Sequence, residues 1–240
     1  MGLQNATGEY VLFIDADDYV YPQYFERIDE SISDDVDLLE FGYYNEQTGT
    51  NIVPHRLRKR MSVLSNFMYE PYGYLAAMWS RVIRRLFEGV EHSKAIYTED
   101  YYVLYQIYRK EPTIKKLDDI LYYYCKNSNS ITNDYSDESK IKGNAIASLD
   151  VGTSLLERFA DKRAEQRRLE AYICLTCAGV YSLYNRYGVT DGKAEFVRIF
   201  RKHVSLGAFM VSGLIPKMVI LIFGLSPKLH SKLSSLINHR

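Results

Sequence analysis

The sequence has few cysteines and no run of apolar residues long enough to span a bilayer, and both absences narrow the kind of protein it encodes. Three cysteines in 240 residues are too few for a disulfide framework. The first five residues, starting at Met1, lack the charged and apolar regions of a signal peptide. The apolar stretch Ala208–Phe223 falls short of the ~20 residues that cross a membrane. We therefore expect a cytoplasmic protein in a reducing compartment.

Net charge is also absent, because 30 basic residues balance 30 acidic ones. A neutral chain has no general attraction to polyanions, so we expect no nucleic-acid partner. The charge is nevertheless distributed unevenly, since no acidic residue follows Glu195 and seven basic residues do. An acidic body with a charge of −7 thus precedes a basic tail of +7.

Cys174 and Cys177 have the spacing of a metal-binding or redox pair. They lie in Ala171–Leu183, which has the pattern of a buried helix, and the chain has no second cysteine pair to complete a zinc site. We interpret them as small packing residues.

The first half of the chain predicts an α/β fold. Short apolar segments predict strands, and segments with helical spacing predict helices. The predicted strands are Glu9–Asp15, Val36–Tyr44, Thr113–Lys116 and Ile120–Lys126, with an irregular or strand-bearing loop at Asn51–Arg60. The predicted helices are Pro22–Ser33, Tyr72–Phe87 and Glu99–Arg109.

The second half predicts helices alone, over Glu138–Phe159, Asp161–Tyr187 and Asp191–His203. The apolar run Ala208–Phe223 and a further amphipathic helix follow. We therefore divide the chain into residues 1–135, 136–207 and 208–240.

Three carboxylates crowd together at Asp15, Asp17 and Asp18, directly after the first predicted strand. Asp15 and Asp17 share one face if this segment is extended, while Asp18 turns elsewhere. Carboxylates repel one another unless a cation compensates, and hard oxygen ligands suit Mg²⁺ or Mn²⁺. The alternative is a solvated acidic turn that caps the following helix.

An apolar strand ending in Asp-x-Asp is also typical of haloacid-dehalogenase-type phosphatases, in which the first aspartate is the nucleophile. That family has a hydroxyl residue and an apolar residue soon after the second aspartate, and later a Gly-Asp motif. This chain continues with Asp18-Tyr19, and its later acidic pair, Asp118-Asp119, has no glycine. A phosphatase is therefore a lesser alternative.

Three motifs in order resemble family 2 glycosyltransferases. The segment Gly2–Asp18 resembles the loop, strand and DxD motif of that family, and Tyr97–Asp100 resembles its Glu-Asp motif at a helix start. Tyr122–Thr132 is similar to the strand and Arg-x-x-Gly-Ser-Ile-Thr-type loop, with Lys126 near the place of the arginine and Asn129 in place of the glycine. The resemblance spans residues 2–132, slightly over half of the chain.

The resemblance implies a GT-A, Rossmann-like sheet with flanking helices, followed here by an all-α region. It implies that Asp15 and Asp17 hold Mn²⁺ or Mg²⁺ against the diphosphate of a nucleotide-sugar donor. Asp18 belongs to the same binding loop, and Lys126 and Ser130 are candidate donors to the diphosphate. Asp100 is the expected catalytic base, with Glu99 beside it at the helix start. The reaction implied is inverting transfer of a hexose to a cell-surface glycan or lipid-linked acceptor.

The chain departs from the family pattern at its beginning. The family's nucleotide-binding half precedes the DxD strand, whereas Met1 lies directly before it here. About 80 residues are thus expected to be missing, given that one βαβ unit takes ~30. The alternative function is therefore a catalytically incomplete remnant or subunit of such an enzyme.

Aromatic residues offer two interpretations. Trp79 and tyrosines such as Tyr101 and Tyr102 are able to stack on sugar rings. With 22 tyrosines in the chain, packing in the core is the better prediction for any one of them.

The basic tail predicts a membrane contact. Ser226 is placed to cap a helix that Pro227 opens, in which Leu229 and Leu233 share one face and Lys228 and Lys232 lie off it. We expect this helix to bind an anionic membrane surface, which would hold the protein at the inner face of the cell membrane. The alternative is a pair of C-terminal helices packed in an ordinary core.

Overall fold

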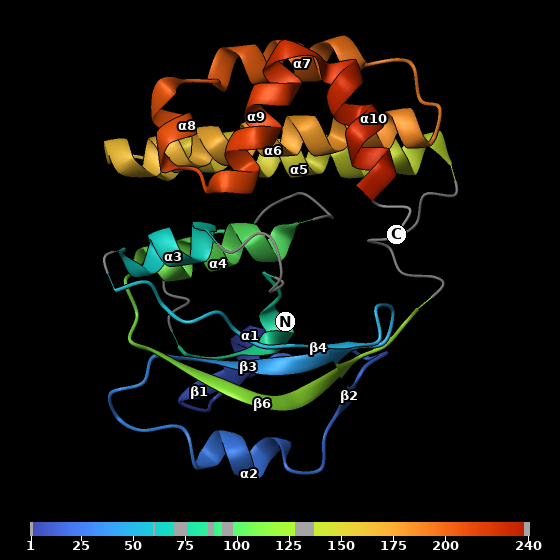
Figure 1. Ribbon diagram of the computed structural model, residues 1–240. Helices are drawn as coiled ribbons and strands as arrows, with labels where there is room; N and C mark the ends of the chain where they lie inside the picture. The colour runs from blue at the N-terminus through green and yellow to red at the C-terminus, as the bar shows by residue number, and fades with distance from the viewer. Residues whose placement is uncertain are drawn as a thin grey trace. The chain divides into compact units, whose positions relative to one another are not determined.

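The computed structural model describes residues 2–59, 61–69, 76–85, 89–92, 98–127 and 137–237 (Figure 1). The contacts divide the chain into two compact units. The first contains residues 1–92 and 100–128, and the second contains residues 93–99 and 129–240.

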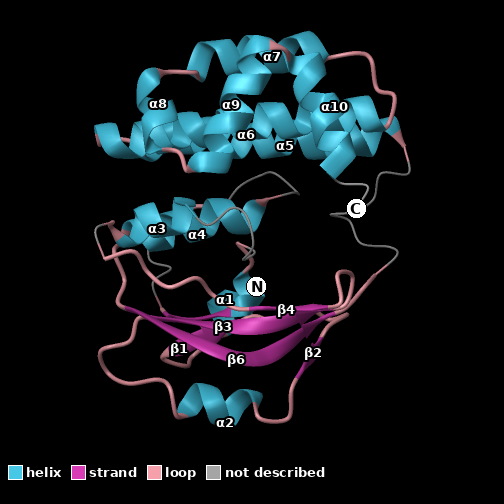
Figure 2. Ribbon diagram, viewed as in Figure 1, coloured by secondary structure: helices cyan, strands magenta, loops and turns pink. Residues whose placement is uncertain are grey.

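The first unit is built on a mixed β-sheet, which the described residues form with six strands (Figure 2). The strands are β1 (Tyr10–Leu12), β2 (Tyr19–Val20), β3 (Leu38–Asn45), β4 (Thr50–Ile52), β5 (Arg81–Arg84) and β6 (Ile114–Tyr124). Their order is β1-β5-β3-β6-β2, with β4 paired to β3. β3 and β6 are parallel, and the other pairs are antiparallel.

β3 is the central strand of this sheet. Its first six residues, Leu38–Tyr43, are all buried, as expected for a strand covered on both faces. Tyr44 of β3 lies opposite Tyr123 of β6, with ring centroids 5.0 Å apart, and such cross-strand aromatic pairs stabilise the register.

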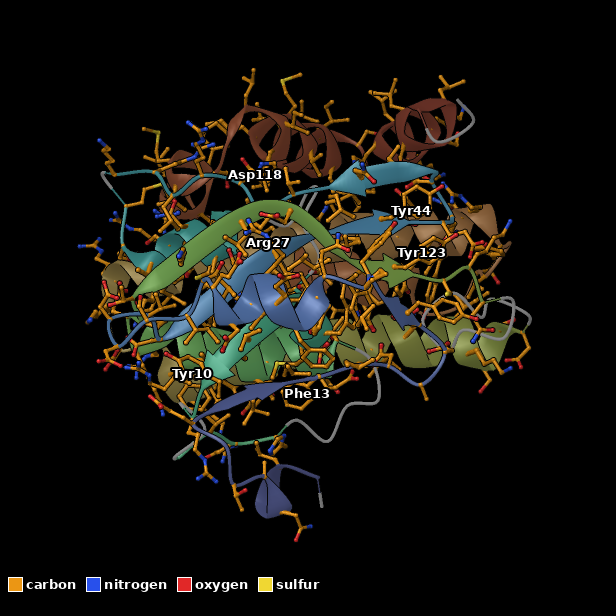
Figure 3. All side chains as sticks on the ribbon, turned by 90° about the horizontal axis from the view of Figure 1, so that it is seen from below. Tyr10, Phe13, Arg27, Tyr44, Asp118 and Tyr123 are labelled. Atoms are coloured by element: carbon orange, nitrogen blue, oxygen red, sulfur yellow. The ribbon has the colours of Figure 1, made fainter. Side chains whose placement is uncertain are left out.

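The described helices of this unit are α1 (Gly2–Asn5), α2 (Tyr24–Asp29), α3 (Val63–Tyr69) and α4 (Glu99–Arg109). Three of them cover the two faces of the sheet (Figure 2). α2 lies on one face, and α3 and α4 lie on the other. Arg27 of α2 donates hydrogen bonds to both carboxylate oxygens of Asp119 on β6, at 2.9 and 3.3 Å. Figure 3 looks onto this face, with Arg27 on the helix and Asp118 on β6.

Most predicted elements of the first unit are present, and the α/β fold class is confirmed. β3, β4 and α4 form where the pattern predicts them, although the helix after Pro22 is shorter than expected. The two strands predicted at Thr113–Lys116 and Ile120–Lys126 are one long strand, β6. The strand predicted at Glu9–Asp15 is shorter and lies at the sheet edge, paired antiparallel to β5.

The helix predicted over Tyr72–Phe87 is wrong. The described part of this segment contains a 3₁₀ turn, η1 (Met78–Ser80), followed directly by β5. The physical reason is Arg81, whose buried charge meets Glu40 and Tyr108 when this segment is a strand.

Arg81 is the centre of a buried polar network. Its guanidinium lies 3.2 Å from the Glu40 carboxylate and donates to the Tyr108 hydroxyl at 2.9 Å, and that hydroxyl donates to Glu40. Lys116 Nζ lies 2.8 Å from the other Glu40 oxygen. Complete burial alone would raise the pKa of Glu40, but Arg81 and Lys116 hold it below its ordinary value.

The second unit is helical throughout its described residues. Its helices are α5 (Glu138–Phe159), α6 (Arg163–Arg186), α7 (Lys193–His203), α8 (Leu206–Val211), α9 (Leu214–Leu225) and α10 (Pro227–Ile237). One apolar cluster joins residues from α5, α6, α7 and α9, and both Cys174 and Cys177 lie in it, fully buried. The prediction that these cysteines are packing residues is confirmed.

The helices after residue 207 share this unit. Phe223 of α9 packs on Tyr181 of α6 and on Phe200 of α7, with ring centroids 5.4 and 4.9 Å apart. The contacts thus divide the chain into two units, with residues 137–237 in one of them, and a separate role for residues 208–240 stays a prediction. Within the described ranges, no helix is both long and apolar enough to cross a membrane.

The buried network predicts that substitution of Glu40 lowers the free energy of unfolding more than substitution of Asp119 does. Glu40→Gln leaves Arg81 and Lys116 without their counter-charge and should cost about 3–5 kcal/mol of unfolding free energy. Asp119→Asn breaks only the partly exposed pair with Arg27 and should cost about 0–1 kcal/mol. Urea unfolding of both variants measures the difference, and equal losses would contradict the role given to Glu40.

Candidate active site

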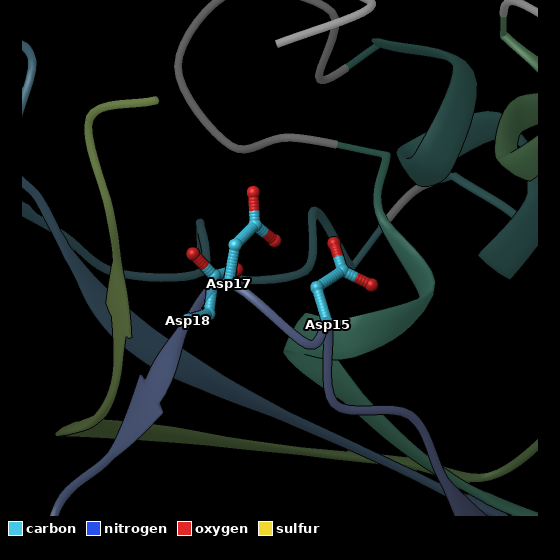
Figure 4. A group of neighbouring side chains, drawn as sticks. All are labelled: Asp15, Asp17 and Asp18. Carbon is cyan, nitrogen blue, oxygen red and sulfur yellow. The ribbon is translucent and has the colours of Figure 1, made fainter. Parts of the chain in front are cut away.

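The three carboxylates after β1 lie on a tight turn. The backbone N–H of Asp18 donates to the carbonyl oxygen of Asp15 at 3.2 Å. One carboxylate oxygen from each of Asp15, Asp17 and Asp18 lies within 4.8 Å of the others. Figure 4 shows the carboxylates of Asp15 and Asp17 pointing to the same side of the turn. Asp18 lies close to the other two carboxylates because the backbone folds into a turn instead of continuing as an extended strand, but both of its own oxygens are bonded to residues on or just after β6.

Tyr122 of β6 fixes this acidic turn. Its hydroxyl donates to Asp18 Oδ2 at 2.8 Å and accepts from the backbone N–H of Asp15 at 3.0 Å. The backbone N–H of Cys125 donates to Asp18 Oδ1 at 2.8 Å. Asp18 therefore serves to anchor the turn to the end of β6.

Asn127, in the segment after β6, contacts the carboxylate of Asp17. Asn127 Nδ2 donates to Asp17 Oδ2 at 2.6 Å. Lys126 is exposed, and its backbone N–H donates to Glu46 at 2.7 Å. Ser130, the other expected contact to the diphosphate, lies outside the described residues.

Trp79 packs against Tyr122, the residue that anchors the acidic turn. Its ring stacks on Tyr122, with centroids 4.6 Å apart, and on Tyr124, at 5.2 Å. Tyr43 of β3 meets it edge-on at 4.8 Å. Trp79 is 5% exposed, so it is a packing residue that holds Tyr122 in place and not a sugar-stacking surface.

Met78, the residue before Trp79, holds Asp100 in place. The backbone N–H of Met78 donates to Asp100 Oδ2 at 2.9 Å, and Asp100 lies in the first turn of α4. The residue before this helix, Thr98, has a φ of 59°, which is rare for a β-branched residue and is found mostly where the structure imposes it. Glu99 is exposed, whereas Asp100 is half-buried.

Asp100 lies close enough to the acidic turn to affect the pKa of Asp15, so the four carboxylates belong to one site. Burial and the neighbouring carboxylates of Asp18, Asp100 and Asp17 raise the pKa of Asp15 to about 6. Burial also raises the pKa of Asp18, against the opposing effect of its hydrogen bonds from Cys125 and Tyr122. Four carboxylates thus repel one another here.

This donor set fits a hard divalent cation. Carboxylate oxygens are the ligands that Mg²⁺ and Mn²⁺ prefer, and a cation would relieve the repulsion that raises the pKa of Asp15. Asp15 and Asp17 are the residues that would hold it, because Asp18 already anchors the turn.

Several of the residues that build the site were not predicted as such. Tyr122 and Trp79 carry no charge and lie about 100 and 60 residues from the acidic turn in sequence. The signal available was the alternation of Tyr122 and Tyr124, which places two rings on one face of a strand. The backbone N–H of Met78 and the amide of Asn127 leave no such signal in the sequence.

Residues 1–90 match the sequence model of "Glycosyl transferase family 2". Residues 1–90 are a family 2 glycosyltransferase segment. This segment contains the acidic turn, Trp79 and the Met78 amide. The resemblance to that family is thereby confirmed for the segment that holds the first motif, Gly2–Asp18. The motifs at Tyr97–Asp100 and Tyr122–Thr132 lie beyond the matched residues and stay predictions.

A curated relative extends the likeness beyond this glycosyltransferase segment. The chain is 28% identical over 145 residues to the uncharacterized glycosyltransferase EpsJ of Bacillus subtilis (strain 168). The match covers 55% of this chain and 42% of that relative, so the chain spans less than half the length of the curated relative it matches.

The repulsion at Asp15 predicts a substitution that stabilises the protein in the absence of metal. Because the folded-state pKa of Asp15 is raised, its carboxyl destabilises the fold as pH rises through about 4 to 6. Asp15→Asn removes this penalty, which we place near 1 kcal/mol because solvent screens the exposed group. At pH 7 without metal, Tm should rise by about 2–4 °C.

The same substitution should abolish the increase in Tm that Mn²⁺ gives to the unmodified protein. Asp118→Asn, which neutralises an exposed carboxylate on β6, is the matched control and should change neither quantity. Differential scanning calorimetry with and without Mn²⁺ measures both. A variant that loses stability but keeps the Mn²⁺ effect would remove Asp15 from the site.

Proposed function

We propose that this chain carries the catalytic centre of a metal-dependent glycosyltransferase. Its substrates would be a nucleotide-diphosphate sugar and a glycan or lipid-linked acceptor. The observation that carries the proposal is the convergence of the acidic turn and Asp100, which are 82 residues apart in sequence, on the η1 turn of a family 2 glycosyltransferase segment.

Asp15 and Asp17 would hold Mn²⁺ or Mg²⁺ together with the donor's diphosphate. A bound cation supplies charge neutralisation for the leaving diphosphate. Tyr122, Cys125 and Asn127 keep the carboxylates in position before any ligand arrives, so no reorganisation is needed as the leaving charge develops.

Asp100 is the proposed general base. Asp100 lies in the first turn of α4 and accepts a hydrogen bond from the Met78 N–H, so its carboxylate is held in a fixed position from which it would take the proton of the acceptor hydroxyl. In an inverting transfer the acceptor oxygen bonds to the anomeric carbon while the bond to the diphosphate breaks. The hydroxyl proton goes to Asp100, and the electron pair leaves with the nucleoside diphosphate.

Lys126 is the proposed cationic contact to the diphosphate. It is exposed and adjoins Asn127, which already contacts Asp17, so the segment that carries it reaches the acidic turn. Ser130 would add a hydroxyl donor from the same segment.

A second candidate function is that of an incomplete subunit. Among the described residues β1 pairs with β5 alone, which leaves its other edge open. Strands of a nucleotide-binding half, in the same polypeptide or in another, would pair with that edge. The phosphatase alternative has no support, because the matching residues are those of a transferase family.

The two candidates differ in what the 240-residue chain does by itself. A complete enzyme releases nucleoside diphosphate from one of a panel of donor sugars with Mn²⁺ present. An incomplete subunit does so only after addition of a nucleotide-binding half, and we expect this second result because of the open β1 edge. Turnover by the purified monomer would contradict it.

Substitutions of Glu99 and Asp100 show which of these two residues at the start of α4 is the general base. In a protein active in transfer, Asp100→Asn should lower the rate by about 10²-fold or more with little change in donor affinity. Glu99→Gln is the matched control and should have a smaller effect, since that side chain is exposed. If the two substitutions exchange their effects, Glu99 is the base.

A further inference from the structure

The second unit has an apolar face that points away from its own core. α9 buries Ile220 and Phe223, which are 3% and 1% exposed. Its opposite side carries Leu214, Met218 and Leu221 at intervals of three to four residues, and all are 47–79% exposed. A helix that is apolar on both sides needs a second apolar surrounding, and the described core covers only one side.

α10 continues this face, because its polar side packs inward and its apolar side is exposed. Ser226 Oγ accepts from the N–H of Leu229 at 3.2 Å, so the predicted cap is present. The side that packs inward is polar: His230 and Ser231 are buried, and His230 lies 3.2 Å from the Ser182 hydroxyl. Leu229 and Leu233 are exposed instead. α9 and α10 both pack on α6, as the alternative of a C-terminal helix pair packed in a core expects, and the membrane contact stays a prediction.

The exposed residues belong to one surface. α8, α9 and α10 all contact α6, so the sides they turn away from α6 form the outer surface of this unit. We call Leu214, Met218, Leu221, Leu225, Leu229 and Leu233 the apolar face. Contiguous apolar surfaces of this kind mark sites of protein or membrane contact.

The charge next to the apolar face favours a membrane over a protein as its partner. Lys228 and Lys232 are exposed beside Leu229 and Leu233, and the chain contains no acidic residue after Glu195. In a two-fold dimer formed through this face, both copies would bring their lysines to one interface, and this part of the chain supplies no acidic residue to pair with them. An anionic bilayer surface offers both an apolar layer for the leucines and negative headgroups for the lysines.

A hollow of about 580 Å³ opens beside the apolar face, between α7, α8 and α9. Leu221 and Leu225 belong to both the face and the hollow, and Leu206 and Phe209 are among the other apolar residues that line it. Arg201 lies at the hollow as well. Its apolar lining suits an acyl chain, and a guanidinium suits a lipid phosphate.

We propose that the apolar face of α9 and α10 docks the protein on an anionic lipid surface, with the two helices lying in the plane of the interface. This inference concerns the second unit and does not rest on the proposed transferase activity. Its test accordingly uses no activity.

Vesicle flotation of the full chain tests the proposal, using phosphatidylcholine vesicles with and without phosphatidylglycerol. The protein should float with the anionic vesicles. Leu225→Glu should lower the partition coefficient by about tenfold or more, because a charge replaces a side chain that enters the bilayer. Ile146→Glu is the matched control, since it makes the same change at an exposed position on α5 and should float like the unmodified protein.

A second variant isolates the charge contribution. Lys228→Gln/Lys232→Gln should weaken binding to anionic vesicles by about 30-fold and leave binding to neutral vesicles unchanged. Equal losses in the Leu225→Glu and Ile146→Glu proteins would overturn the proposal, as would failure of the unmodified protein to float. Self-association in lipid-free buffer that Leu225→Glu abolishes, with no flotation, would assign the face to a second copy of the chain.

Discussion

The first unit depends on keeping one buried positive charge paired. Arg81 is 1% exposed and lies against the fully buried Glu40, so any arrangement that separates them leaves a charge without a partner in the core. The same guanidinium donates to the Ala77 carbonyl at 2.7 Å and to the Ser80 hydroxyl at 2.8 Å, and these residues flank and end η1. Pairing the charge thus fixes the shape of η1 as well as the junction of β3, β5 and α4.

The candidate active site is built on η1. Met78 holds Asp100 through its N–H, and Trp79 stacks on Tyr122, which holds the acidic turn. Two neighbouring residues of one 3₁₀ turn therefore position carboxylates from two distant segments. Asp15 and its neighbours remain mutually repulsive, which is unfavourable for the fold and useful for a cation site.

Much of the architecture follows from local patterns, because helices such as α5 and α7 and strands such as β3 have a period that their own sequence fixes. The acidic turn and Asp100 were predicted as site residues because motif spacing carries them. The pattern at Tyr72–Phe87 failed, since helical spacing there is overridden by the need of Arg81 for partners in the sheet. The orientation of α10 was equally beyond the sequence: a leucine stripe predicts which residues share a face and not which face meets the core.

The acidic turn and Asp100 form one candidate active site around η1, in which Asp15 and Asp17 would hold the metal beside Asp100. The most direct test is paramagnetic broadening by Mn²⁺ of the backbone N–H signal of Met78 in protein labelled with ¹⁵N-methionine. We predict that this signal broadens at Mn²⁺ concentrations well below that of the protein, and that Asp15→Asn/Asp17→Asn prevents the broadening. A Met78 signal that stays sharp while Mn²⁺ binds elsewhere on the protein would contradict the account.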